Sequence, residues 1–246
     1  MKITFTDTIG VLEEFEPKPA DKFIPSWYKD MDSYLGATKD TRGDGKTNGT
    51  IKRCMPVFDS ITAGYIIPTY VDVFVRQGEK NNIVYDGPID ISGIKSQPEY
   101  EAPSLAPLGL HPIEQAPTHP YRGSHVLSYP KWINPWAIKT PPGYSTLFIQ
   151  PMHRESLFTI LPGIVDTDRY TAPINFPFVL NKADSFQGVI PAGTPIVQAI
   201  PFKRDSWEME FGKIEDFNQS ANDFKKIFTK VFDAYKTDFR QTKEYK

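Results

Sequence analysis

Hydrophobic and polar residues alternate along much of the middle of the chain. The clearest case is Tyr70–Arg76, in which Val71, Val73 and Val75 alternate with other side chains, a period of two that is typical of a β-strand. Residues 81–85 follow a short polar turn, and we expect them to form the hairpin partner. Similar segments bounded by glycine or proline are 1–5, 132–138, 144–150, 156–161, 174–180, 188–190 and 195–202. The pattern predicts an all-β body of about eight to twelve short strands.

Both ends of the chain show helical periodicity instead. Near the C-terminus, hydrophobic residues recur at three- and four-residue steps: Phe217, Ala221, Phe224, Phe228, Val231, Phe232, Tyr235 and Phe239. This spacing predicts an amphipathic helix with a lysine-rich polar face and with Asn218 or Ser220 as its N-cap. The helix either packs on the β body or binds a partner or a second copy. Near the N-terminus, Pro25 followed by Trp27 and Met31 predicts a short helix.

These elements suggest three parts of the chain. Residues 1–50 are an N-terminal extension with the short helix and an exposed loop, residues 51–210 are the all-β core, and residues 211–246 are the C-terminal helix packed on that core. The chain contains 23 prolines, which helix interiors and central strands exclude. Their density over 98–142 predicts a long proline-rich loop with few regular elements.

Composition narrows the functional classes. The net charge is −2, with acidic and basic residues interspersed, so an extended nucleic-acid site is not expected. Cys54 is the single cysteine, which excludes an internal disulfide framework and predicts a buried, inert thiol beside Met55. No apolar run approaches the roughly 18 residues needed to span a bilayer, and the N-terminus lacks a signal-peptide pattern. We expect a soluble protein without a membrane partner, in the cytoplasm or in a particle assembled there.

One stretch carries candidate chemistry at a strand end. Gly163 to Tyr170 includes Asp166, Asp168 and Arg169. At a hairpin tip, a carboxylate can orient water, a guanidinium can bind phosphate and a tyrosine ring can stack on a sugar or base. The alternative is a structural turn in which the two carboxylates accept backbone N–H donors.

Other candidate groups give weaker signals. Three histidines of the proline-rich loop could join a carboxylate in a metal site of the kind found in metal-dependent oxygenases, or they are surface residues: His111, His119 and His125. An aromatic and proline cluster could form a stacking platform, or it belongs to the core: Trp132, Pro135, Trp136, Pro141, Pro142 and Tyr144. Basic residues that could supply charge for an anion are Lys52, Arg53, Arg154, Lys203 and Arg204.

The stretch from Gly163 to Tyr170 resembles the third motif of the trimeric dUTPases and their dCTP-deaminase relatives. Ile190 to Gln198 is similar to a later turn of that family, Ala63-Gly64-Tyr65 to its first motif, and Pro142 to Ser145 lies where its Arg-Ser-Gly motif belongs. The resemblance covers residues 55–202 loosely and 141–202 better. It implies a β-clip fold, which is a distorted all-β barrel or sandwich.

The resemblance also implies a nucleotide site. Asp166 would be the catalytic residue, and Mg²⁺ would accompany it if the protein acts on nucleotides. The ligand-binding positions that follow from the motifs are Tyr65, Tyr144, Ser145, Arg169, Tyr170 and Gln198. No other cofactor and no resident metal are expected.

The chain departs from the dUTPase pattern at the catalytic positions. Ile66 follows Ala63-Gly64-Tyr65 where the family has an aspartate, and no arginine precedes Ser145. Arg169 stands where the family's stacking aromatic residue is expected, and the C-terminal helix replaces a glycine-rich arm. Because a phosphate site needs positive charge or oriented donors, these departures favour binding over catalysis.

A second resemblance extends over most of the chain. It is to an uncharacterised family of proteins from tailed phages and some bacteria, and it rests on six segments: 25–28, 52–56, 62–65, 134–136, 141–145 and 193–198. It implies a phage origin, with the protein in the cytoplasm of the host cell or in the virion.

The leading hypothesis is therefore a phage-type, non-catalytic β-clip-like protein that acts in assembly, as a virion component, or by sequestering a ligand. Its expected partners are phage structural proteins or a small nucleotide-like ligand, and it is a possible homo-oligomer. The first alternative is a nucleotide hydrolase of the dUTPase or dCTP-deaminase type that uses Asp166. The second is a metal-dependent oxygenase that uses the loop histidines.

Overall fold

The structure is a computed structural model that describes residues 1–10, 13–36, 38–40, 48–77, 83–86, 107–115, 128–181, 187–213, 217–230 and 232–246. The chain divides into two compact units. The first comprises Met1–Phe23 with Gly64–Arg204, and the second comprises Ile24–Ala63 with Asp205–Lys246. These units group the chain differently from the expected boundaries at residues 50 and 210. The expected packing of the C-terminal helix on the β core stays a prediction.

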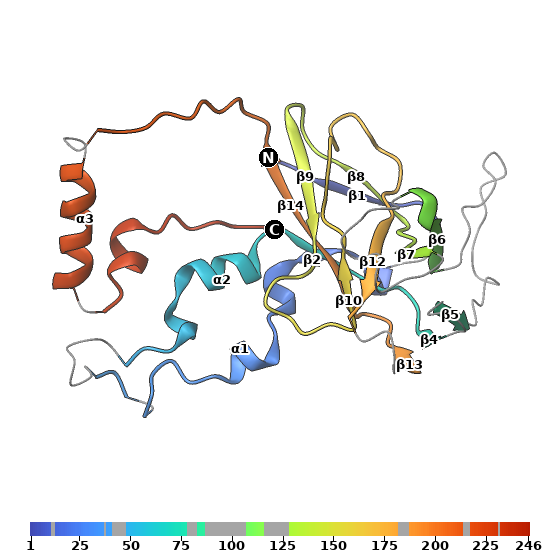
Figure 1. Ribbon diagram of the computed structural model, residues 1–246, viewed down its shortest axis with the longest axis horizontal. Coiled ribbons are helices and arrows are strands. Elements are labelled where there is room, and N and C mark those ends of the chain that lie inside the picture. Colours follow the sequence, from blue (N-terminus) through green and yellow to red (C-terminus); the bar gives the residue numbers. More distant parts are fainter. Residues whose placement is uncertain are drawn as a thin grey trace. The chain divides into compact units, whose positions relative to one another are not determined.

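The first unit contains four antiparallel sheets among its described residues (Figure 1). In sheet order, the largest consists of β11 (Gly163–Val165), β9 (Tyr144–Ile149), β14 (Pro195–Lys203), β3 (Tyr65–Pro68) and β2 (Lys18–Pro19). The second consists of β10 (Phe158–Ile160), β12 (Phe176–Leu180), β7 (Ser128–Trp132) and β6 (Leu108–Pro112). The two smaller ones consist of β13 (Gln187–Ile190), β4 (Val73–Gln77) and β5 (Ile83–Asp86), and of β1 (Thr4–Asp7) and β8 (Trp136–Lys139). Short 3₁₀ turns are η1 (Glu13–Phe15), η2 (Ala20–Phe23) and η5 (Ile113–Gln115).

Aromatic side chains join the two largest sheets. Phe148 of β9 contacts Phe176 of β12, with ring centroids 5.3 Å apart. Within the second sheet, Trp132 of β7 contacts Phe158 of β10 and Phe178 of β12, with centroids at 5.2 and 5.3 Å. All five rings are almost fully buried, and such pairs are worth about 0.5–1.5 kcal/mol beyond their buried area. Two open sheets that share one core make a sandwich-like arrangement, so the prediction of a mainly β fold is confirmed.

Strand β14 lies at the centre of the largest sheet. It pairs with β3 on one side and with β9 on the other, and residues 196–199 are buried. The sequence of a strand that is covered on both faces is a continuous apolar run and does not alternate between apolar and polar residues. Gln198 is the polar exception, and its side-chain oxygen accepts the backbone N–H of Met152 at 3.0 Å.

The predicted hairpin is confirmed, because β4 and β5 pair in antiparallel register with Phe74 opposite Asp86. The proline-rich region holds more regular structure than expected, because β6, β7 and β8 all lie within 98–142. Pro130 fits inside β7 because the pairing with β12 begins only at Lys131, and a proline is tolerated where a strand has a free side. The rest of that region, including His119 and His125, lies outside the described residues.

The second unit is helical in its described part. It contains α1 (Ser26–Asp30), η3 (Ile51–Arg53), α2 (Met55–Thr62), α3 (Phe217–Thr229) and a short π-helix, η8 (Tyr235–Phe239). The expected short N-terminal helix and the C-terminal amphipathic helix are both confirmed. Helix α2 was not expected, although a proline in its first turn is a usual start signal.

Ion pairs hold the C-terminal residues against α2 inside this unit. Asp59 of α2 accepts hydrogen bonds from Arg240 at 2.6 Å and from Lys243 at 3.0 Å. Asp59 and Arg240 are both largely buried, and the hydrogen bonds from Arg240 lower the pKa of the Asp59 carboxyl. The interaction is therefore a partly desolvated anchor rather than a solvent-screened surface pair.

The predicted C-terminal helix is shorter than its hydrophobic stripe. It begins at Phe217, so the proposal of Asn218 or Ser220 as N-cap is wrong, and both lie inside the first turn. The helix ends at Thr229, and Asp233 has a φ of 62°. That left-handed backbone conformation cannot continue a right-handed helix, so the stripe is divided between α3 and η8.

We predict that Gly64→Ala destabilises the protein by about 2–5 kcal/mol. Gly64 has a φ of 69°, and an added Cβ would overlap the carbonyl oxygen of Ala199 in β14 and lie 3.1 Å from the Cα of Ile200. Denaturant unfolding measures the change. The control is Gly10→Ala, because Gly10 has a φ of 80° with open space around it and should lose only about 1 kcal/mol. Equal losses in the two variants would contradict the close approach.

Candidate functional site

The turn after β11 is held by buried threonines. Thr167 is fully buried, and its hydroxyl forms hydrogen bonds of 2.8 Å with the hydroxyls of Thr140 and Thr146. The carbonyl oxygen of Asp166 accepts the N–H groups of Arg169 and Tyr170, both at 2.9 Å. The carboxylates on either side of Thr167 are therefore carried by a rigid turn.

Arg204, which follows β14, brings both carboxylates together. Its guanidinium donates to Asp168 at 2.8 Å and lies 3.1 Å from an Asp166 oxygen. The same nitrogen is 3.1 Å from the Ser145 hydroxyl, which itself donates to Asp166 at 2.7 Å. The backbone N–H of Gly143 donates to Asp168 at 2.8 Å. The Asp168 side chain is 6% exposed, whereas that of Asp166 is 57% exposed.

These contacts set the protonation states. Hydrogen bonds from Arg204, with help from the Gly143 N–H, hold the pKa of Asp168 far below its usual range. The Ser145 hydroxyl and the nearby Arg204 also lower the pKa of Asp166, and Asp168 raises the pKa of Arg204. A general base works best with a pKa near the operating pH. A carboxylate whose pKa is lowered is a weak base. This geometry therefore suits a structural role, and we call Arg204 with Asp166 and Asp168 the clamp.

Two predicted ligand-binding residues lie away from the clamp. Gln198 is opposite Ile149, four residues along β9 from Ser145, which corresponds to about 13 Å at the usual rise of a strand. Tyr65 is buried and packs edge-on against Phe5, with centroids 5.3 Å apart. Both side chains serve the core of the first unit.

The other predicted residues surround Asp166. Tyr144 contributes its carbonyl oxygen, which accepts a hydrogen bond from Arg204 at 3.2 Å. Arg169 and Tyr170 are exposed on the turn, and the Tyr170 side chain remains 51% accessible. The structure thus brings together Tyr144, Ser145, Asp166, Arg169 and Tyr170. The cation that organises them, Arg204, was noted in the sequence only as a possible anion-binding residue.

The remaining candidates gain little support. His111 forms a 2.7 Å hydrogen bond with Gln115. Across the described ranges, no three or more His, Cys, Asp or Glu side chains gather in a way that could hold a metal ion. Trp132 and Trp136 are buried in the core, where their indole N–H groups have no acceptor among the described residues. These rings act through packing and do not form an accessible stacking platform.

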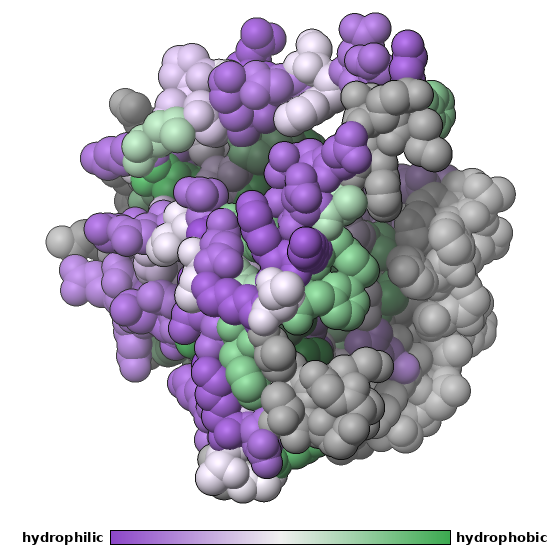
Figure 2. Space-filling view, turned by 90° about the vertical axis from the view of Figure 1, so that its left-hand side faces the viewer, coloured by the Kyte–Doolittle hydropathy of each residue, from purple (hydrophilic) through white to green (hydrophobic). Residues whose placement is uncertain are grey.

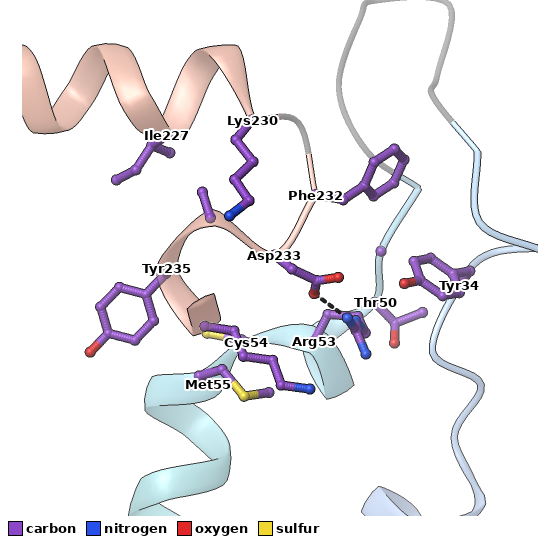
Figure 3. A pocket seen from close by; sticks show the side chains of 13 residues that line it. Tyr34, Thr50, Arg53, Cys54, Met55, Ile227, Lys230, Phe232, Asp233 and Tyr235 are labelled. Atoms are coloured by element: carbon purple, nitrogen blue, oxygen red, sulfur yellow. Dashed lines mark hydrogen bonds and ion pairs between the residues drawn. The ribbon is translucent and has the colours of Figure 1, made fainter. Parts of the chain in front are cut away.

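A pocket of about 240 Å³ lies within the second unit (Figure 3). Its walls come from Tyr34, from Gly49 and Thr50, from Arg53 to Met55, from Ile227 of α3 and Lys230 just after it, and from Phe232 to Lys236. Figure 3 shows Ile227 of α3 and Lys230, which follows the helix, opposite the sulfur-bearing side chains of Cys54 and Met55. Cys54 is exposed, so the expectation of a buried thiol is wrong; as the residue before α2 it stays at the surface, whereas Met55 is buried.

Charges in the pocket are unevenly compensated. Arg53 forms an ion pair with Asp233 and stacks over the Tyr34 ring at 5.4 Å. Lys230 donates to Asp238 at 2.7 Å. Lys236 also lines the pocket, and within the described part of the chain it has neither an ion-pair nor a hydrogen-bond partner. The pocket therefore combines aromatic walls with one uncompensated cation.

The second unit also exposes large hydrophobic side chains. Trp207, Met209 and Phe211 are 90%, 80% and 84% exposed, and they belong to an extended segment that forms no helix or strand, which we call the apolar arm (residues 205–211). On α3, Phe224 and Phe228 are 62% and 67% exposed. Figure 2, which views the face that carries α3, shows hydrophobic surface between hydrophilic side chains. Patches of this kind mark interaction sites.

No protein-family model matches the chain, and no curated protein matches it at a significant level. Of the helices in the described ranges, none combines the length and the apolar character that crossing a bilayer requires. The functional argument therefore rests on the geometry of the clamp, the pocket and the apolar arm.

We predict that Asp168→Asn lowers the unfolding temperature at neutral pH more than Asp166→Asn does, because Asp168 is the more buried partner of Arg204. The pKa of Asp168 is lower in the folded chain than in the unfolded one, so its contribution is present above the unfolded value of about 4 and declines as the pH falls below it. Thermal unfolding between neutral and acidic pH should show the variant and the wild type converging. A constant difference across that range would contradict the clamp.

Proposed function

We propose that the protein is a non-catalytic assembly protein that binds another protein through the apolar arm. The observation that carries the proposal is the near-complete exposure of Trp207, Met209 and Phe211 on a segment without regular structure. Tryptophan and other aromatic residues are enriched among the residues that dominate binding energy at protein interfaces. A partner that covers these side chains would remove them from water, and the ordering of this short segment is one part of the cost of association.

The arm has the alternating sequence pattern of a β-strand, although it is not paired in any sheet among the described residues. Trp207, Met209 and Phe211 alternate with Glu208 and Glu210, which places the apolar side chains on one face of an extended chain and the carboxylates on the other. Addition of such a segment to a sheet edge is a common mode of peptide recognition. The free edge supplies backbone hydrogen bonds, and pockets beside it accept alternate side chains.

Charge indicates what kind of surface the arm binds. Residues 205–211 contain Asp205, Glu208 and Glu210 and no basic residue. Antiparallel pairing of two arms about Met209 would set Glu208 opposite Glu210 twice, and like charges directly opposite each other destabilise a sheet. The fitting occupant is therefore a different protein, with an apolar groove at a sheet edge and a basic rim. The resemblance to tailed-phage proteins suggests a phage structural protein.

The clamp supports the non-catalytic part of the proposal. Asp166, the residue that the dUTPase resemblance implicates in catalysis, is engaged by Ser145 and Arg204. A site for nucleotide phosphates needs cations that are free to meet them, whereas the Arg204 guanidinium is already shared between two carboxylates.

We predict that the full chain co-elutes with a capsid, portal or tail protein of a tailed phage in size-exclusion chromatography with light scattering. Trp207→Ala combined with Phe211→Ala should abolish the complex, and Glu208→Lys combined with Glu210→Lys should weaken it because the rim charge is reversed. Leu35→Ala is the matched control, since Leu35 is 64% exposed in the same unit but outside the arm. A monomer that binds none of these proteins would exclude the assembly role, and a self-associating chain would replace the partner with a second copy.

The enzymatic alternative is tested separately. We predict that the wild type and Asp166→Asn release no product above background from a panel of deoxynucleoside triphosphates with Mg²⁺, followed by chromatography. Comparable folding of the two proteins is checked by circular dichroism. Turnover by the wild type that disappears in Asp166→Asn would reject the non-catalytic proposal and restore the nucleotide hydrolase.

A further inference from the structure

We infer that the pocket of the second unit binds a small organic carboxylate with a flat apolar body. The site is independent of the apolar arm, because none of its lining residues belongs to 205–211. It is formed by segments far apart in the sequence, from Tyr34 to Lys236, that meet inside one compact unit.

The cations of the pocket define the charge of the ligand. Three basic residues and one acidic residue line it among the described residues: Arg53, Lys230, Lys236 and Asp233. The Asp233 carboxylate pairs with Arg53, and Lys230 is directed to Asp238 just outside the lining. Lys236 is left to meet a bound anion, and a charge-assisted hydrogen bond is about twice as strong as a neutral one.

The remaining walls define the body of the ligand. Tyr34, Phe232 and Tyr235 contribute rings, and Ile227 and Met55 contribute aliphatic surface (Figure 3). Met55 is buried and Phe232 is half-buried, whereas Ile227 and Tyr235 are 44% and 43% exposed and leave apolar surface for a ligand to cover. Flat apolar molecules bind between such side chains, while a few polar groups fix their orientation.

The volume limits the size of the ligand. Pockets for drug-sized molecules range from about 300 to 1,000 Å³, and this one is about 240 Å³. A single aromatic ring with one carboxylate fits that description, whereas a nucleoside triphosphate does not: it is too large, and its several negative charges would face one uncompensated lysine. At about 0.3 kcal/mol for each non-hydrogen atom, a ligand of about nine such atoms would bind with a dissociation constant on the order of 10 mM.

Cys54 provides a direct readout, because it is the single cysteine of the chain, is exposed and lines the pocket. The experiment measures the rate at which iodoacetamide alkylates Cys54 in the full chain, with and without benzoate, by intact-protein mass spectrometry. Benzamide, which has the same ring without the charge, and inorganic phosphate, which has charge without a ring, are the matched probes. We expect benzoate to slow alkylation severalfold, and benzamide and phosphate to have little effect.

Two lysine variants separate the pocket from general charge effects. Lys236→Gln should remove most of the protection by benzoate, while Lys225→Gln, on the same unit but outside the pocket, should retain it. Comparing rates with and without ligand within each variant cancels any change in the thiol itself. Equal protection by benzoate and benzamide, full protection of Lys236→Gln, or no protection of the wild type would each overturn the inference. Because the arm is untouched, failure here leaves the assembly proposal standing.

Discussion

The burial of β14 is the constraint on which the first unit depends. This strand is the central member of the largest sheet, and a buried strand must satisfy every polar group that it carries. Its backbone pairs with two neighbours, and Gln198 finds its partner in the chain after β9. The same constraint explains Gly64, since the chain entering β3 approaches Ala199 too closely for any side chain. Gly64 and Gln198 are thus both explained by the packing of one strand.

Arg204, the residue directly after β14, links this strand to the edge of the sheet. The edge strand β11 is only three residues long, and β9 is its one partner among the described strands, so few hydrogen bonds hold it. Arg204 reaches the turn after β11 and binds Asp166 and Asp168, which ties the edge of the sheet to its centre across β9. Because the pair with Asp168 is largely shielded from water, it is stronger than an exposed surface ion pair. Asp166 and Asp168 therefore stabilise the fold by holding the turn after β11 against the end of β14.

Period-two alternation located β4, and turn residues on either side marked most of the other strands. The alternation was misleading over Trp132 to Ile138, which was predicted as one strand but is divided between β7 and β8. The Asn134 side chain interrupts the strand, because it donates to the Trp136 carbonyl and accepts the Trp136 N–H. The Asp166 turn was visible in the sequence, but its partner Arg204 was not, since 36 residues separate Arg204 from Asp168. The pocket depends on still longer separations, which no local pattern encodes.

The charged side chains of the two units differ in whether they are paired within the fold. This difference bears on the two proposed interactions, which are that of the arm with a protein and that of the pocket with an organic carboxylate. In the first unit both carboxylates of the acidic turn are paired with Arg204 within the fold. In the second unit the arm carries three carboxylates and no basic residue, whereas the pocket retains an uncompensated lysine. A basic protein surface that suits the arm would be repelled by the pocket, and an organic anion that suits the pocket would be repelled by the arm. The two proposed occupants therefore have opposite charges, and the two proposals together predict that one does not compete with the other.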